Sequence, residues 1–118
     1  MLARAERLQQ QFFTVRHPSA HPAWEPPVDV LETETEVLIF FALPGVDPDS
    51  VEVALEAGTL VVRGRRVLPD ELRTAMIHRL ELPQGRFERR VPLPPNHYDT
   101  MRRRATNGCL LISLNKAA

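Results

Sequence analysis

The sequence predicts an all-β fold in which antiparallel strands pack as a β-sandwich, and three observations support this. Apolar residues recur in short runs, several with a period of two, as expected for strands with one buried face. Glycines and prolines separate these runs, which is typical of turns. The chain has 11 prolines in 118 residues, which argues against a helical bundle. Short strands separated by turns are the usual pattern of a β-sandwich.

The first predicted strand covers residues 28–31, and the second covers residues 37–43 and is apolar on both faces. Glu32 to Glu36 form the turn between them. Further strands are expected at residues 51–55, 60–65, 77–82, 87–93 and 109–114. Residues 98–106 should form a strand by position, although three consecutive arginines, Arg102 to Arg104, fit a strand poorly.

The N-terminal segment differs from the rest of the chain. Between residues 2 and 15 the apolar side chains follow helical spacing, which predicts a short amphipathic helix that is marginal in water by itself. Residues 17–23 contain Pro18 and Pro22 and form a linker. The expected organisation is therefore a flexible, partly helical arm at 1–23, a sandwich domain at 24–116 and a short tail at 117–118.

Composition limits the partners and the compartment. Lys plus Arg equals Asp plus Glu at 15 each, so no net charge draws the protein toward nucleic acid or an acidic membrane. No run of about 18 apolar residues could span a membrane, and the N-terminus lacks the apolar run of a signal peptide. A single cysteine fits a reducing compartment. We expect a cytoplasmic protein with neither nucleic-acid nor membrane partners.

No residue pattern indicates bond chemistry. His17 and His21 are four residues apart, but prolines deny them a helix and no further ligand lies nearby to complete a zinc site. Cys109 is expected to be a small packing residue. The glycines stand singly, so no phosphate-binding loop is present. We expect neither an enzyme nor a metal site, and no cofactor.

Several separated motifs occur in a characteristic order. They are Pro27-Val28-Asp29-Val30, Leu43-Pro44-Gly45-Val46, Gly85-Arg86-Phe87-Glu88-Arg89, Leu93-Pro94 and Asn107-Gly108-Cys109-Leu110. From about Trp24 to Lys116 the chain resembles the small heat shock proteins, the Hsp20 family built on an α-crystallin domain. This resemblance implies an immunoglobulin-like β-sandwich and an ATP-independent holdase chaperone that binds partly unfolded client proteins.

The resemblance also implies that the N-terminal arm binds clients, because a mobile segment with exposed apolar groups can fit many partners. The expected client-binding residues are Leu8, Phe12, Phe13, Val15 and Trp24. The alternative is an arm that only packs within an oligomer.

The loop between Arg66 and Ala75 is too polar for the core and too long for a hairpin turn. By resemblance it carries a strand, either residues 66–68 or residues 73–76, that pairs with residues 28–31 of a partner subunit. Arg79 and Glu81 project to one strand face and either pair across this interface or form a solvated face. The expected homodimer interface comprises Val28, Val30, Arg66, Val67, Leu68, Arg79 and Glu81.

The family's C-terminal Ile-x-Ile motif, which links dimers by docking into a groove, has no counterpart at the end of this sequence. The groove itself is expected around Val51, Val53, Leu55, Leu110 and Ile112. We therefore expect dimers or small homo- or hetero-oligomers. An alternative of another class is an adaptor resembling the p23 or CS-domain co-chaperones, which binds one specific folded partner.

Overall fold

The computed structural model describes residues 23–117 of the chain. In this part the strands are β1 (Val28–Glu32), β2 (Glu36–Ala42), β3 (Glu52–Glu56), β4 (Thr59–Arg66), β5 (Gly85–Pro92), β6 (Tyr98–Thr106) and β7 (Cys109–Lys116). Two short 3-10 helices, η1 (Pro48–Ser50) and η2 (Asp70–Arg73), lie in the connections. The predicted all-β fold is confirmed, whereas the predicted helix at residues 2–15 lies outside the described residues.

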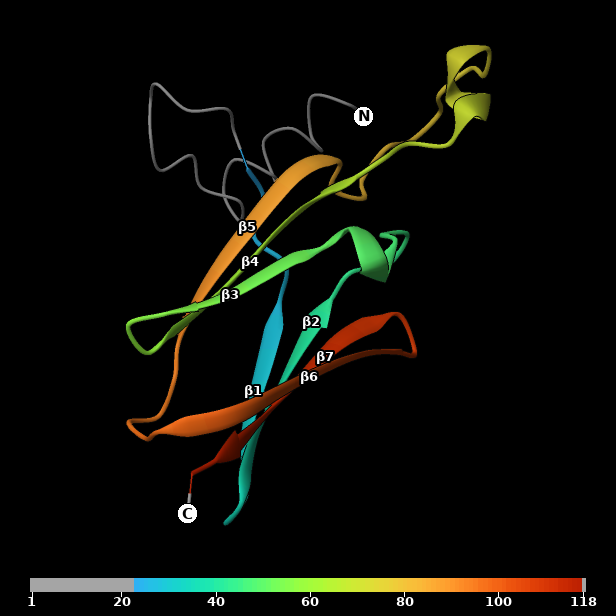
Figure 1. Ribbon diagram of the computed structural model, residues 1–118. Helices are drawn as coiled ribbons and strands as arrows, with labels where there is room; N and C mark the ends of the chain where they lie inside the picture. The colour runs from blue at the N-terminus through green and yellow to red at the C-terminus, as the bar shows by residue number, and fades with distance from the viewer. Residues whose placement is uncertain (1–22, 118) are drawn as a thin grey trace.

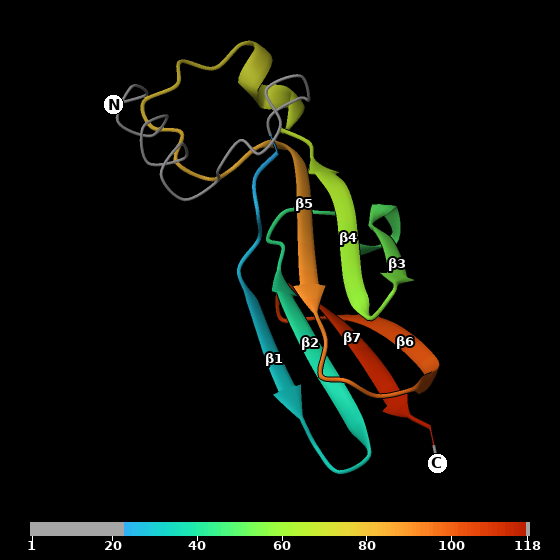
Figure 2. The ribbon, with the colours of Figure 1, turned by 90° about the vertical axis from the view of Figure 1, so that its left-hand side faces the viewer.

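The strands form two antiparallel sheets with the orders β1-β2-β7-β6 and β3-β4-β5. Figure 1 shows the three-stranded layer lying across the four-stranded layer. Strands β1 and β6 are the two edges of the larger sheet, and in Figure 2 they lie on opposite sides of the molecule. Each sheet therefore keeps unpaired backbone groups along its edge strands, where another chain could add.

The core lies between the sheets and follows from the period-two pattern. Alternate residues of β2, namely Val37, Ile39 and Phe41, are fully buried. Each is paired with a buried residue of β7, in the registers Val37↔Leu114, Ile39↔Ile112 and Phe41↔Leu110. The facing sheet contributes Leu60, Val62, Phe87 and Val91 to the same cluster. The sequence pattern therefore fixes which face of each strand turns inward.

Gly64 of β4 marks a close approach to the core. A Cβ atom at this position would lie 2.5 Å from Cζ of Phe87, whose side chain is fully buried. We expect Gly64→Ala to lower the free energy of unfolding by roughly 1–3 kcal/mol, because the Phe87 ring must shift within a packed core. Urea unfolding followed by circular dichroism measures this loss. The neighbouring exposed change Arg65→Ala serves as the control, and equal losses in both variants would contradict the steric explanation.

Candidate protein-binding surfaces

Large apolar side chains remain exposed at three places in the described part of the chain. The first is β1, the second is the pair of facing strands β3 and β6, and the third is the long connection between β4 and β5. The residues concerned are Val30, Leu31, Leu55, Met101, Val67, Met76, Ile77 and Leu82. Isolated exposed apolar residues are ordinary, but grouping of this kind is typical of protein-binding surfaces.

The long connection, residues 67–84, projects beyond the ends of the sheets (Figure 2). Met76 is 80% exposed and Val67 is 71% exposed. The strand predicted at residues 77–82 is wrong for the single chain, because these residues form no strand in the structure. A strand needs a neighbour for its backbone hydrogen bonds, and the alternating pattern finds none within this subunit.

The base of this connection is held by Arg66, the last residue of β4. Its Nε atom donates to the Pro44 carbonyl oxygen at 3.1 Å, and a terminal nitrogen donates to the Pro83 carbonyl oxygen at 3.3 Å. Arg66 was predicted to lie at a dimer interface, but here its guanidinium group joins two segments of its own subunit. Of the neighbouring interface candidates, Val67 is exposed and Leu68 is half-buried.

Arg79 and Glu81, also predicted at the interface, lie within the same connection. Arg79 donates to the Glu81 carboxylate at 3.3 Å, and both side chains are more than half exposed. Exposed ion pairs contribute little to stability. Within one subunit this arrangement matches the solvated face that was the alternative to an interface contact.

Strand β1 presents a second surface. It pairs only with β2, so its other edge is free. Leu31 is 52% exposed and Val30 is 39% exposed, while Val28 is half-buried against the core. An apolar edge strand of this kind is a template for pairing with another chain.

The predicted groove differs from the surface that the structure shows. Val51, Leu110 and Ile112 are buried in the core at 3%, 2% and 0% exposure, so their side chains do not form an open surface. Val53 is half-buried and Leu55 is 41% exposed. A groove between β3 and β6, the edge strands of the two sheets, would therefore have only Val53 and Leu55 of the predicted residues on its β3 side.

The other side of this groove comes from β6, which the sequence analysis did not include. Met101 and Ala105 are in register with Leu114 and Leu110, so they share the inward face of their sheet. Met101 is 46% exposed, and β6 is an edge strand of the larger sheet. The alternate positions of Met101, Arg103 and Ala105 could have indicated that these side chains share one face of the strand. The three consecutive arginines obscured this pattern.

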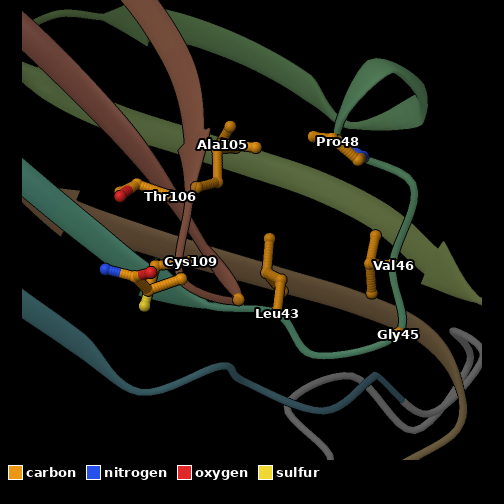
Figure 3. A pocket seen from close by; sticks show the side chains of 10 residues that line it. Leu43, Gly45, Val46, Pro48, Ala105, Thr106 and Cys109 are labelled. Carbon is orange, nitrogen blue, oxygen red and sulfur yellow. The ribbon is translucent and has the colours of Figure 1, made fainter.

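A cavity of about 300 Å³ lies between the β6–β7 turn and the segment that links β2 to β3. Figure 3 shows its side chains, which are mostly apolar. The lining includes Leu43, Val46, Pro48, Ala105, Cys109 and Leu110. Cys109 is half-buried there, in keeping with the packing role expected for it.

Residues 29–118, which make up most of the chain, match the Hsp20/alpha crystallin family. The chain belongs to this family. It is 36% identical over 92 residues to "16.9 kDa class I heat shock protein 3" of Oryza sativa subsp. japonica, covering 76% of this chain and 62% of that relative. It is 27% identical over 92 residues to "Small heat shock protein C2" of Rickettsia felis, covering 77% of this chain and 60% of that relative. The chain thus spans about three fifths of the length of these curated relatives.

Comparison with solved structures also supports membership of this family. The structure resembles that of hspA from Xanthomonas axonopodis with a TM-score of 0.70 at 34% identity, covering 79% of this chain and 94% of that one. HSP18.5 from E. histolytica gives a TM-score of 0.72 at 28% identity, covering 81% and 91% of the two chains. The predicted α-crystallin sandwich is therefore confirmed. Hsp20 is a family of heat shock proteins and not of enzymes, in agreement with the expectation from the sequence.

In this Hsp20 protein, Trp24 is part of the core and not an exposed client-binding residue as predicted. Its side chain is 6% exposed, and its ring centroid lies 5.1 Å from that of Phe87. Its indole Nε1 donates to the Gly85 carbonyl oxygen at 3.2 Å. The other four client-binding candidates, Leu8, Phe12, Phe13 and Val15, lie outside the described residues.

Arginines on the outer face of the smaller sheet are used in ion pairs. Arg63 Nε donates to a Glu88 carboxylate oxygen at 2.8 Å, and this bond lowers the pKa of the Glu88 carboxyl group and raises that of Arg63. Arg90 lies 3.5 Å from the same carboxylate. Arg63 and Arg90 therefore both form ion pairs with Glu88 in the folded chain.

Residues 23–117 contain no group of three or more His, Cys, Asp or Glu side chains placed to hold a metal ion. Among the same residues, no helix has the length and apolar character needed to cross a membrane.

Proposed function

We propose that this Hsp20 protein is an ATP-independent holdase chaperone, which binds partly unfolded proteins and suppresses their aggregation in the cytoplasm. The observation that carries the proposal is the grouped apolar exposure of a heat shock family member, with Met76 80% exposed and Val67 71% exposed. Covering apolar surface contributes roughly 25 cal/mol per Å². A few hundred Å² would give several kcal/mol before ordering costs, which suits reversible capture without nucleotide.

The N-terminal arm is the proposed main site for clients. Of its apolar residues, Leu8, Phe12 and Val15 follow helical spacing and would share one face of a helix, with Phe13 at the side of that face. Unfolding clients expose apolar surface that such a stripe can cover. The proposed site ends before Trp24, whose side chain is buried in the sandwich.

The proposed assembly is a homodimer formed by strand exchange, with small homo- or hetero-oligomers built from it. Two features support it: the free edge of β1 with exposed Val30 and Leu31, and the long exposed connection at residues 67–84. The exchanged stretch would be residues 66–68 or residues 73–76, as expected from the sequence, and the alternating residues 77–82 of the same connection also lack a partner strand in their own subunit. Pairing with β1 of a second subunit would supply the missing hydrogen bonds.

The groove between β3 and β6 is a second proposed docking site, for an extended segment of a client or of another small heat shock protein. Leu55 and Met101 flank it and are 41% and 46% exposed. Both strands have a free edge, so an added segment could also form backbone hydrogen bonds. Nothing among the relatives named above supports the adaptor alternative.

The test is to heat an aggregation-prone client without nucleotide and to follow its aggregation by light scattering. We expect the full chain to suppress scattering and a chain lacking residues 1–23 to lose most of this protection. Phe12→Ser with Phe13→Ser should weaken protection, because it removes apolar contact area. Gln10→Ser with Thr14→Ser, on the side of the helix opposite Leu8 and Phe12, is the control and should protect fully.

Circular dichroism of each variant would show that the sandwich stays folded. No protection by the full chain would contradict the holdase proposal. Full protection by the Phe12 and Phe13 double variant would leave a holdase but contradict the arm as its client site.

A further inference from the structure

Arg103 of β6 crosses the gap between the two sheets. It is in register with Ile112, so its side chain leaves the inward face of the larger sheet. One terminal nitrogen of its guanidinium group donates to the Val51 carbonyl oxygen at 2.9 Å, and the other donates to the Pro48 carbonyl oxygen. Both acceptors belong to the segment that leads into β3, so Arg103 bridges the two sides of the groove.

The acceptors of Arg103 are held in place by local structure. Asp47 caps η1, accepting a hydrogen bond from the Asp49 backbone nitrogen at 3.0 Å, and Ser50 Oγ donates to the Asp47 carbonyl oxygen at 2.6 Å. Pro48 occupies the start of this turn, where its fixed φ angle suits the helix. The Pro48 carbonyl group is therefore held in position as an acceptor. Its hydrogen bond and that of the Val51 carbonyl group favour this one position of the Arg103 side chain.

The bridge spans a surface that could otherwise hold an extended segment. Leu55 on β3 and Met101 on β6 are both exposed, and Pro48, whose carbonyl group accepts from Arg103, lines the cavity together with Ala105 (Figure 3). A segment lying along the groove must displace the guanidinium group from the two carbonyl groups. Arg103 is exposed in the free chain, but a bound segment would cover the displaced guanidinium group, which would then need a new acceptor.

The charge of β6 indicates which acceptor fits. Arg102, Arg103 and Arg104 are consecutive, and within residues 23–117 none of them forms an ion pair with a carboxylate. A carboxylate accepts two parallel hydrogen bonds from one guanidinium group, which a neutral amide cannot match. The proposed groove therefore offers apolar contacts together with one guanidinium group that is bound to two carbonyl groups but has no carboxylate partner.

We propose that Arg103 makes the groove selective for extended apolar segments that carry a carboxylate, and that it excludes neutral apolar segments. The carboxylate of an acidic segment would replace the two hydrogen bonds that the guanidinium group loses to the Val51 and Pro48 carbonyl oxygens. A neutral segment has no group that would replace them in this way. This inference rests on the proposed docking role of the groove, but it does not depend on the arm or on client protection.

The test uses two fluorescently labelled eight-residue peptides with isoleucines at alternate positions, which differ only by one central Glu or Gln. Binding to the full-length protein is measured by fluorescence anisotropy. The wild type should bind the Glu peptide at least about tenfold more tightly than the Gln peptide, which is the effect of one charge-assisted hydrogen bond. Arg103→Ala should bind both peptides alike, with the Gln peptide gaining affinity because the bridge is absent.

Two further variants separate selectivity from general charge and from folding. Arg102→Ala removes an outward-facing charge of the same strand and should keep the tenfold preference. Arg103→Lys keeps the charge but loses the fork, and should lose most of the preference even if Arg103→Ala does not fold.

Equal binding of the two peptides by the wild type would overturn the inference, as would a preference that survives both Arg103 variants. Failure of every protein to bind either peptide would overturn it as well. The client-protection assay is run on the same samples. Protection without peptide selectivity would reject the role of Arg103 and leave the holdase proposal standing.

Discussion

Replacing Trp24 by alanine is expected to lower the free energy of unfolding by roughly 3–5 kcal/mol, the range found when large buried aromatic residues are truncated. The ring is 6% exposed and packs against Phe87. Its backbone also extends the smaller sheet, since Trp24 N donates to the Arg86 carbonyl oxygen and Glu88 N donates to the Trp24 carbonyl oxygen. Urea unfolding followed by far-ultraviolet circular dichroism measures the loss.

Trp24→Phe is the matched control for this prediction. Phenylalanine keeps an aromatic ring against Phe87 but removes the indole bond to Gly85, so we expect a loss of about 1 kcal/mol from that bond in addition to some loss of packing. If Trp24→Ala unfolded at the same urea concentration as the wild type, the ring would not belong to the core. Its assignment to the client-binding arm would then return.

Replacing residues 67–84 by a short glycine-serine turn is expected to convert the proposed dimer into a monomer. The exchanged strand would be lost, while Arg66 and Gly85, which are paired at the ends of β4 and β5, could still be joined as a hairpin. Light scattering coupled to size-exclusion chromatography should show the mass falling from about twice that of the 13.4 kDa chain to that of one chain.

A point change on the receiving strand tests the same interface from the other side. Leu31→Lys alters a side chain that is 52% exposed, so the monomer should stay folded while dimerisation weakens. Leu55→Lys changes a similarly exposed residue on the other sheet and is the control. An unchanged dimer mass in both the loop replacement and Leu31→Lys would contradict strand exchange.

The strands with strong alternation or apolar runs were predictable, because a buried face requires apolar side chains at fixed spacing. Residues 37–43 and 109–114 were assigned to strands from the sequence, and the structure pairs β2 with β7 at the centre of the core. Edge strand β6 was harder to predict. Its three arginines are compatible with a strand only because an edge strand can be solvated on both faces, which sequence cannot show.

The remaining errors arise from contacts between residues far apart in the sequence. Residues 77–82 have the pattern of a strand, but a strand also needs a partner, and none is available within the subunit. The burial of Trp24 depends on Phe87, and Arg103 bonds to carbonyl groups 52 and 55 positions earlier. Local patterns predict which elements form, whereas such pairings depend on how the two sheets are stacked.

The two edges of the larger sheet differ in a way that restricts how copies of this chain can associate. Sheets that can add a strand at both ends grow head to tail without limit, which leads to open filaments. Here the β6 edge carries Arg102 to Arg104, so two such edges brought together would repel each other. We therefore expect two copies to avoid joining through their β6 edges and to associate through the β1 side, where a two-fold arrangement closes on itself.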